Sequence, residues 1–311
     1  MFQGMEYVYE VYKERSFSKA AQKLYISQPS LSATIKKIES RIGSPLFDRS
    51  TTPIQLTECG KEYIRSMEKI MDIESEFENY LNDLNELKTG HIAIGGSNLY
   101  TSFVLPPLLT RFTQQYPSVN IRLEEADSAQ LKKRLFAGTL DLVIDNCQMD
   151  DSIYEGHCFK SEYIFLAVPS SFSSNTKAKA YQLTRDDILS SRFLDDSFPC
   201  VPLPLFEQDP FLFLRSGNDT RQRAEQICQL WDFHPRVILK LDQQITAFNL
   251  SCFGMGCSFA SDTLIRTLSR PVNICYYKLP LQGAHREIYF YHKKTRYITR
   301  AIEEFLKITA Q

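Results

Sequence analysis

Residues 16–57 constrain the fold of this chain more than any other stretch. Residues 18–24 have the pattern of a short helix, and their Ala-Ala pair is small enough for a second helix to cross closely over it. After a short turn, Ser27 is placed to cap the next helix, and Pro29 lies in its first turn, where a missing N–H costs nothing. The stretch therefore predicts two short helices joined by a tight turn.

The second of these helices has one buried stripe, because apolar residues recur along it at helical spacing. Small polar groups at its start are typical of a helix-turn-helix whose second helix enters the DNA major groove. Residues 45–47 and 54–56 then read as two short strands around a polar tip, which predicts a wing. The buried stripe consists of Leu31, Ile35, Ile38 and Ile42.

The run SFSKAAQKLYISQPSLSATIKKIESRIGSPLFDRS, followed by LTECG, closely resembles the winged helix-turn-helix of LysR-type transcriptional regulators. The resemblance extends along the whole run without gaps. The alternative is a small helical domain with no DNA role, but this leaves the Ser/Gln/Pro-rich start of the second helix without a packing reason. A first helix with apolar residues at positions 2, 5, 8, 9 and 12 is expected to pack on the Ala-Ala surface.

Contacts to phosphates position a protein on DNA, and contacts to base edges specify the sequence. Gln28 can pair bidentately with adenine, and Pro29 offers an apolar face to a thymine methyl group. For Thr34 and Lys36 the alternative is a solvated helix face. By resemblance, the residues expected to contact DNA are Ser18, Ser27, Gln28, Pro29, Ser30, Ser32, Thr34, Lys36 and Arg49.

Two positions depart from the family pattern. Members often carry arginine just after the second serine of this helix and another at the wing tip, where this chain has Ala33 and Thr52. The net charge of the chain is −1, and residues 1–65 carry ten Lys or Arg against seven Asp or Glu, a mild local excess of positive charge. We therefore expect a weaker salt dependence and less arginine–guanine readout than is usual.

Thr57 is placed to cap a long helix that we expect to run to residue 88. Its apolar residues form an a/d heptad seam on an otherwise charged helix, which favours a partner helix over packing within the chain. The resemblance implies that this linker helix pairs antiparallel between protomers. The seam consists of Ile70, Ile73, Phe77, Tyr80, Leu84 and Leu87.

From residue 91 onward, strand and helix patterns alternate. The order β-α-β-α-β over residues 91–144 predicts a parallel sheet with ligands at the carboxyl ends of its strands, and the later alternation predicts a second lobe. With landmarks such as FTQQYPSVNI, LFAGTLDLVI and FGMGCSFASD, this part resembles the effector-binding domain of LysR-type regulators, which is like periplasmic binding proteins. The proline-rich segment 198–210 is longer than the usual link there.

The predicted fold class is an N-terminal all-α winged helix-turn-helix with a long linker helix, followed by a C-terminal α/β bilobed, periplasmic-binding-protein-like effector domain. The expected boundaries are residues 1–60, residues 61–89 and residues 90–311. We expect the last part to divide into one lobe of residues 90–165 with 266–311, and a second lobe of residues 166–265.

No catalytic set stands out, and the five histidines show no metal-ligand spacing, so we expect neither an enzyme nor a bound metal or cofactor. Helix N-termini near the strand ends suit an anion, and Asp127, Asp145 and Asp242 could hold an ammonium group. We expect a small zwitterionic or polar organic effector rather than a dicarboxylate. The alternative is that the residues here are only caps and turn formers. The residues expected at the effector, most of them carried over from the family, are Ser97, Asn98, Tyr100, Asp127, Ser128, Asn146, Ser216 and Thr246.

The sequence therefore predicts an effector-responsive regulator that binds double-stranded promoter DNA as a homodimer or homotetramer, with RNA polymerase as an open further partner. The alternative is a small-molecule binding or transport component built on residues 91–311. No signal peptide or membrane-length apolar run is visible, so we expect a cytoplasmic protein without a membrane partner. The eight cysteines form no C-x-x-C pair, and we expect most of them to be free thiols.

Overall fold

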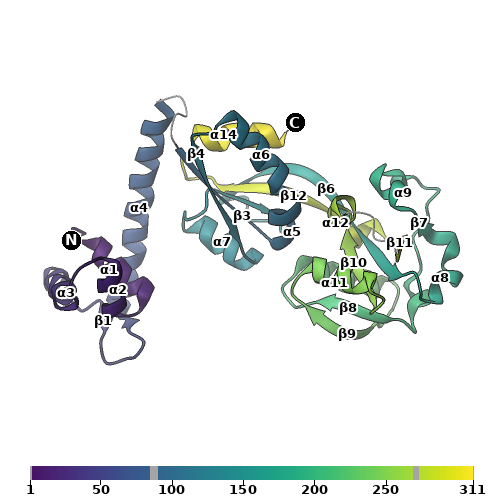
Figure 1. The fold of residues 1–311 in the computed structure, drawn as a ribbon, viewed down its shortest axis with the longest axis horizontal. Coiled ribbons are helices and arrows are strands. Elements are labelled where there is room, and N and C mark those ends of the chain that lie inside the picture. Colours follow the sequence, from purple (N-terminus) through teal and green to yellow (C-terminus); the bar gives the residue numbers. More distant parts are fainter. Residues whose placement is uncertain (1, 85–89, 269–272, 311) are drawn as a thin grey trace. The chain divides into compact units, whose positions relative to one another are not determined.

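The structure is a computed structural model that describes residues 2–84, 90–268 and 273–310 (Figure 1). It contains two compact units, residues 1–80 and residues 81–311. The long helix α4 (Glu58–Leu84) starts within the first unit, and its first turns supply Tyr63, Ile64 and Met67 to that unit's core. The part expected to be a separate linker is therefore also a structural part of the N-terminal unit.

The first unit has the expected winged helix-turn-helix arrangement. Ser27 caps the second helix of the motif by accepting from the Ser30 N–H, and that helix buries Leu31, Ile35 and Ile38 while Ile42 is half-buried. The wing strands pair antiparallel, with Phe47 opposite Leu56. Besides α4, the elements are α1 (Met5–Glu14), α2 (Phe17–Lys23), α3 (Gln28–Ile42), β1 (Phe47–Asp48) and β2 (Gln55–Leu56).

The first helix differs in detail from the expectation. It begins at Met5, after Gly4 in a left-handed conformation, so the residue at position 2 precedes it. Val8 and Val11 are its buried residues, whereas Tyr12 is exposed. The predicted buried stripe of this helix is therefore partly wrong. Its tyrosines lie beside the buried face, and only the two valines are fully buried.

The second unit consists of two lobes joined by strands that they share. The first lobe contains β3 (Gly90–Gly96), α5 (Asn98–Phe103), α6 (Leu105–Gln115), β4 (Val119–Glu125), α7 (Ser128–Phe136), β5 (Leu142–Asp145) and α14 (Arg300–Thr309). The shared strands are β6 (Tyr154–Pro169) and β12 (His285–Lys293). The second lobe contains α8 (Ser174–Lys177), β7 (Gln182–Leu183), α9 (Arg185–Leu189), β8 (Pro210–Leu214), α10 (Asp219–Leu230), β9 (Arg236–Leu241), α11 (Gln244–Cys252), β10 (Cys257–Ser261), α12 (Asp262–Thr267), β11 (Ile274–Lys278) and α13 (Leu281–Ala284).

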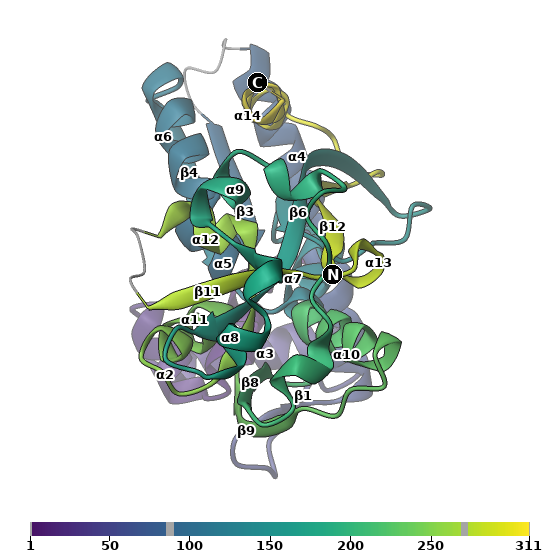
Figure 2. The same cartoon turned by 90° about the vertical axis from the view of Figure 1, so that its right-hand side faces the viewer.

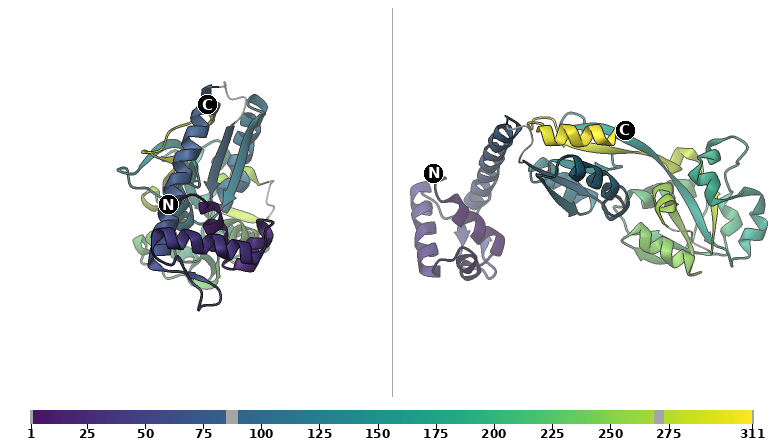
Figure 3. Two further views of the ribbon diagram at one scale, coloured as in Figure 1. Left: turned by 90° about the vertical axis from the view of Figure 1, so that its left-hand side faces the viewer. Right: turned by 45° about the horizontal axis from the view of Figure 1, so that its top comes forward.

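The predicted parallel order is present in both lobes. Strand β3 pairs parallel with β4 and β5 in the first lobe, and β8 pairs parallel with β9 and β10 in the second. Strand β6 pairs antiparallel with β12 at one end and with β10 and β11 at the other, and Figure 3 shows it running from one lobe into the other. The connection between the lobes is therefore a continuous strand rather than a loop.

Two apolar layers flank the sheet of the first lobe. Residues of α5, α6 and α14 pack with one face of the strands, and α7 packs with the other. In the second lobe, the proline-rich segment folds inward, because Val201, Leu203 and Phe206 are fully buried. Figure 2 shows the chain between α8 and α9 on the side that faces the viewer.

One predicted lobe boundary is wrong. Strand β11 pairs with β6 and β7, so residues 274–278 belong to the second lobe and not to the first. Helices α5 and α6 meet at Val104, because Pro106 and Pro107 have no N–H to continue the first one. Helix α10 is capped by the side chain of Asn218, which accepts from the Thr220 N–H.

Candidate functional site

The start of α3 is exposed to solvent. Gln28, Pro29 and Ser30 are exposed, and Ser32 is half-buried. Thr34 is half-buried, and its hydroxyl donates to the Ser30 carbonyl at 3.0 Å. The hydroxyl of Thr34 therefore points back along α3. The predicted groove residues therefore form one solvent-facing group. Ser18, Ser27 and Lys36, which we also expect to contact DNA, are exposed as well.

Arg49, predicted to contact DNA, joins the wing to α3. Its guanidinium donates to Ser32 Oγ at 3.2 Å and pairs with Glu39 Oε2 at 3.1 Å, and it lies 4.9 Å from the centre of the Phe17 ring. Glu39 Oε1 also accepts from the Leu46 N–H at 2.8 Å. This role of Glu39 could not be predicted from the sequence, because a single carboxylate on a helix belongs to no pattern that identifies its partners.

The start of α4 lies close to the chain that enters the wing. The Thr57 hydroxyl donates to the Pro45 carbonyl at 2.7 Å and accepts from the Gly60 N–H at 2.9 Å. A Cβ at Gly60 would fall on the Leu46 carbonyl oxygen, so only glycine permits this close approach. This contact and Glu39 together fix the wing relative to α3 and α4.

The predicted dimerisation seam is described only in part. Ile70 is half-buried, whereas Ile73 and Phe77 are 65% and 61% exposed, which leaves apolar surface uncovered within the described residues. Tyr80 and Leu84 lie on α4, but their side chains are outside the described part of the chain. Leu87 lies outside the described residues altogether.

A cavity of about 610 Å³ lies in the second unit, where the carboxyl ends of strands from both lobes meet. This is the position expected for a ligand of parallel α/β sheets. The prediction for Thr246 is wrong. Thr246 is exposed on α11 and does not line the cavity, whereas Gln244 of the same helix does. The predicted residues that line it are Ser97, Asn98, Tyr100, Asp127, Ser128, Asn146 and Ser216, together with Asp145 and Asp242.

Arg286, on β12, is the centre of a buried ionic network under the cavity. It lies opposite Glu162 on β6, and its guanidinium contacts Glu162 Oε2 at 2.5 Å and Asp219 Oδ2 at 2.7 Å. Burial raises the pKa of Tyr100 well above its usual value, so its hydroxyl stays protonated and lies 3.4 Å from Glu162 Oε2. Asp219 also accepts from Asn146 at 2.8 Å, which connects the second lobe to the first.

Sequence reasoning missed Arg286, Glu162 and Asp219 as a set. Arg286 and Glu162 are 124 positions apart along the chain, and only the pairing of β6 with β12 brings them together. The weak signal in the sequence was a charged residue inside each of two apolar strand patterns, since charges are rarely buried without a partner.

Asp145 is the buried acid that faces the cavity. Its Oδ1 accepts from the N–H groups of Asn146 at 2.7 Å and Cys147 at 3.0 Å, but its Oδ2 has no hydrogen-bond partner within the structure. Burial raises the pKa of this carboxyl, hydrogen bonds from Cys147, Ser128 and Asn146 oppose the rise, and the carboxylate of Asp219 adds a little to it. An incoming donor or cation would therefore find an unsatisfied acceptor here.

The charges that line the cavity are mostly negative. Five carboxyl groups and two guanidinium groups line it. Both guanidiniums are already paired, Arg286 with Glu162 and Asp219, and Arg215 with Asp242 at 3.2 Å. The cavity as folded is therefore better suited to a cationic group than to a second carboxylate. The five acids are Glu125, Asp127, Asp145, Asp219 and Asp242.

The expectation of free cysteines is confirmed, because all eight are unpaired thiols. Burial raises the pKa of Cys147 to about 11 and that of Cys228 to about 12, which keeps both groups protonated and weakly reactive. Within the described residues, no helix is long and apolar enough to cross a membrane.

Comparisons with known proteins agree on both units. Residues 2–61 match the family described as bacterial regulatory helix-turn-helix protein, lysR family, and residues 85–311 match the LysR substrate binding domain. The chain is 29% identical over 311 residues to the uncharacterized HTH-type transcriptional regulator YcgK of Bacillus subtilis, covering 99% of this chain and 93% of YcgK. A probable RuBisCO transcriptional regulator of Trieres chinensis is 26% identical, over 81% of this chain and 77% of its own length.

Solved structures share the same architecture. Full-length OxyR from Pseudomonas aeruginosa superimposes with a TM-score of 0.71 at 18% identity, covering 99% of this chain and 94% of OxyR. Full-length CbnR in complex with its target DNA gives 0.66 at 17% identity, covering 100% and 99%. At such identities the likeness establishes the fold alone, but the two family matches together span nearly the whole chain. The chain therefore belongs to the LysR family of DNA-binding transcriptional regulators, with an effector-binding domain of the LysR substrate-binding type.

Proposed function

We propose that this regulator reads promoter DNA through the first turn of α3, with Gln28 and Pro29 at base edges and Ser30 and Ser32 beside them. The observation that supports this assignment is the exposure of these side chains on one capped helix start. Ser18, Ser27 and Lys36 contact phosphates. Arg49 mainly holds the wing in place, since its guanidinium is already paired with Glu39.

A fluorescence-anisotropy titration tests this reading. The full chain is titrated against DNA from upstream of its own gene and against a random duplex, at two salt concentrations. Gln28→Ala should weaken specific binding by about 1–3 kcal/mol if the glutamine pairs with a base. Gln114→Ala is the matched control, because Gln114 is exposed on α6 in the second unit. Equal specific affinity of wild type and Gln28→Ala would remove Gln28 from the readout.

We also propose that the cavity binds a small effector carrying an amino group, which docks on the free oxygen of Asp145. This choice rests on the excess of carboxylates and on the two guanidiniums that are already paired. A zwitterion can place its own carboxylate against the helix N-termini near Ser97 and Ser128. A dicarboxylate finds no unpaired cation among the described residues that line the cavity.

A thermal-shift panel of amines, amino acids and dicarboxylates distinguishes these classes. We expect amino compounds to raise the melting temperature of the wild type and to lose this effect in Asp145→Asn. Asp186→Asn is the matched control, because Asp186 is exposed on α9, outside the cavity. Stabilisation by dicarboxylates alone would contradict the proposed effector class.

The protein is further proposed to act as a homodimer or homotetramer paired through α4, whose Ile73 and Phe77 are uncovered within one chain. Two DNA-binding units in one assembly would read two half-sites, and effector binding would shift the population between two placements of these units. RNA polymerase is a further proposed partner. The role is one of binding and not catalysis, and it is carried out where the DNA is, in the cytoplasm.

A further inference from the structure

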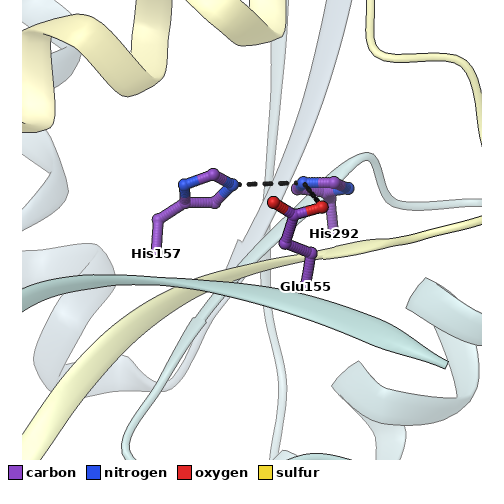
Figure 4. A group of neighbouring side chains, drawn as sticks. All are labelled: Glu155, His157 and His292. Carbon is purple, nitrogen blue, oxygen red and sulfur yellow. Dashed lines mark hydrogen bonds and ion pairs between the residues drawn. The ribbon is translucent and has the colours of Figure 1, made fainter. Parts of the chain in front are cut away.

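A cluster of three side chains lies on the two strands that join the lobes, away from the cavity. Figure 4 shows His157 and Glu155, from β6, and His292, from β12, directed toward one another. In the antiparallel register His292 is opposite Glu155, and His157 lies two residues further along β6 on the same face. His292 is buried, with 3% of its surface exposed, while Glu155 is open to solvent.

The spacing of the donor atoms fits a tetrahedral metal ion. The two Nε2 atoms are 3.1 Å apart, and His292 Nε2 lies 3.7 Å from Glu155 Oε2. All three donor atoms lie within 4.8 Å of one another. Bonds of about 2.0–2.1 Å to a tetrahedral Zn²⁺ place neighbouring donors roughly 3.3–3.4 Å apart, so only small side-chain movements are needed.

The other ring nitrogen of His292 also has a contact that suits a metal ligand. Its Nδ1 lies 3.4 Å from the Lys293 carbonyl oxygen. In the tautomer whose Nδ1–H donates to that carbonyl, the Nε2 lone pair faces the cluster. Metal-bound histidines are commonly oriented by such a contact to a carbonyl.

We propose that Glu155, His157 and His292 bind a divalent transition-metal ion, with Zn²⁺ as the best match, and leave one coordination position for water. Two imidazoles and one carboxylate are a donor set that Zn²⁺ accepts in proteins, usually with a water as the fourth ligand. The competing arrangement is a metal-free pair of neutral imidazoles that share one hydrogen bond.

A bound ion would join β6 and β12 at one end of their pairing. The same two strands carry Glu162 and Arg286 near the other end, under the cavity. Metal binding would therefore stiffen the strands that support both lobes. This site is independent of the DNA and effector proposals, because it shares no residue with either.

The test is calorimetric titration of Zn²⁺ into the metal-stripped, reduced full-length protein, with Co²⁺ absorption as a second readout. We expect one equivalent to bind the wild type, and affinity to fall by at least about tenfold in both His157→Gln and Glu155→Gln. Neither of these side chains is fully buried, and circular dichroism checks that each variant folds. His234→Gln is the matched control, because His234 is exposed outside the cluster.

Three results would overturn the proposal. One is the absence of Zn²⁺ binding to the wild type, which leaves a hydrogen-bonded histidine pair. Another is equal Zn²⁺ affinity in the wild type and both cluster variants. The third is a Co²⁺ spectrum with a thiolate charge-transfer band, since this would assign the bound ion to cysteines instead.

Discussion

The DNA-binding face and the effector cavity are built in opposite ways. The face at the start of α3 uses neighbouring residues of one helix, and most of them are exposed. Their structural contacts are short, such as the cap at Ser27 and the hydrogen bond that Ser32 accepts from Arg49. The cavity uses residues from strand ends across the whole second unit, and its floor is the buried network of Arg286, Glu162 and Asp219. The DNA-binding face is built from residues that are neighbours in the sequence and is exposed to water. The cavity floor is built from residues that are far apart in the sequence and is buried.

This difference determines how each region responds to mutation. A solvated side chain such as Gln28 can change without leaving an unpaired group inside the fold, so the effect should be confined to DNA binding. A charge within the cavity floor stabilises its neighbours, so its loss affects stability and ligand binding together.

Arg286→Ala should give the largest loss of stability. The change leaves the fully buried Glu162 without its guanidinium, while Asp219 keeps its ion pair with Arg223 at 2.8 Å. We expect the uncompensated charge of Glu162 to cost about 3–5 kcal/mol in the free energy of unfolding. Urea denaturation followed by circular dichroism measures it. Arg215→Ala is the control, because the ion pair of Arg215 with Asp242 is exposed and should contribute no more than about 1 kcal/mol. Similar losses in both variants would contradict the contrast.

Gly60→Ala tests whether the stability of the first unit depends on the close approach of α4 to the chain that enters the wing. The added methyl group would meet the Leu46 carbonyl oxygen, and moving that backbone should cost about 1–3 kcal/mol. Gly90→Ala is the matched control, because the nearest atom to its Cβ is a Val119 methyl at 4.0 Å. The unfolding of each full-length variant is followed by differential scanning calorimetry. An unchanged melting profile for Gly60→Ala would show that the wing adjusts freely.

Asp145→Asn should change how stability depends on pH. Burial raises the pKa of Asp145 in the folded protein, so its protonated form supports folding at low pH, and this contribution is lost as pH rises from the unfolded pKa through the folded one. The variant should therefore gain stability relative to the wild type over that range, without ligand. Melting temperatures of both proteins across a pH series measure the difference. A difference that stays constant with pH would contradict the raised pKa.

Ala33→Arg should have the smallest effect on stability and a clear effect on DNA binding. Ala33 is exposed on α3, so the free energy of unfolding should change by no more than about 0.5 kcal/mol. An added phosphate contact should steepen the slope of log affinity against log salt by about 0.9. Ala33→Gln, which adds length without charge, is the control. An unchanged slope would place Ala33 away from the DNA backbone.

The secondary structure and the buried face of the DNA-binding unit were almost completely predictable from the sequence. The cap at Ser27, the buried stripe of Leu31, Ile35 and Ile38 and the wing all follow from spacings of a few residues, because short-range periodicity and capping define a helix and its buried face. The parallel strand order of both lobes was also predictable, since the alternation of elements determines it.

Which side chains contact one another at the strand ends, and across β6 and β12, depends on the tertiary structure. Asp145 could be placed at the cavity from its position after a strand, but its unpaired oxygen depends on which neighbours arrive. Glu162 and Arg286, and likewise His157 and His292, meet because β6 and β12 pair in one particular register. Such a register depends on packing between segments far apart in the chain, and no local pattern in either segment specifies it.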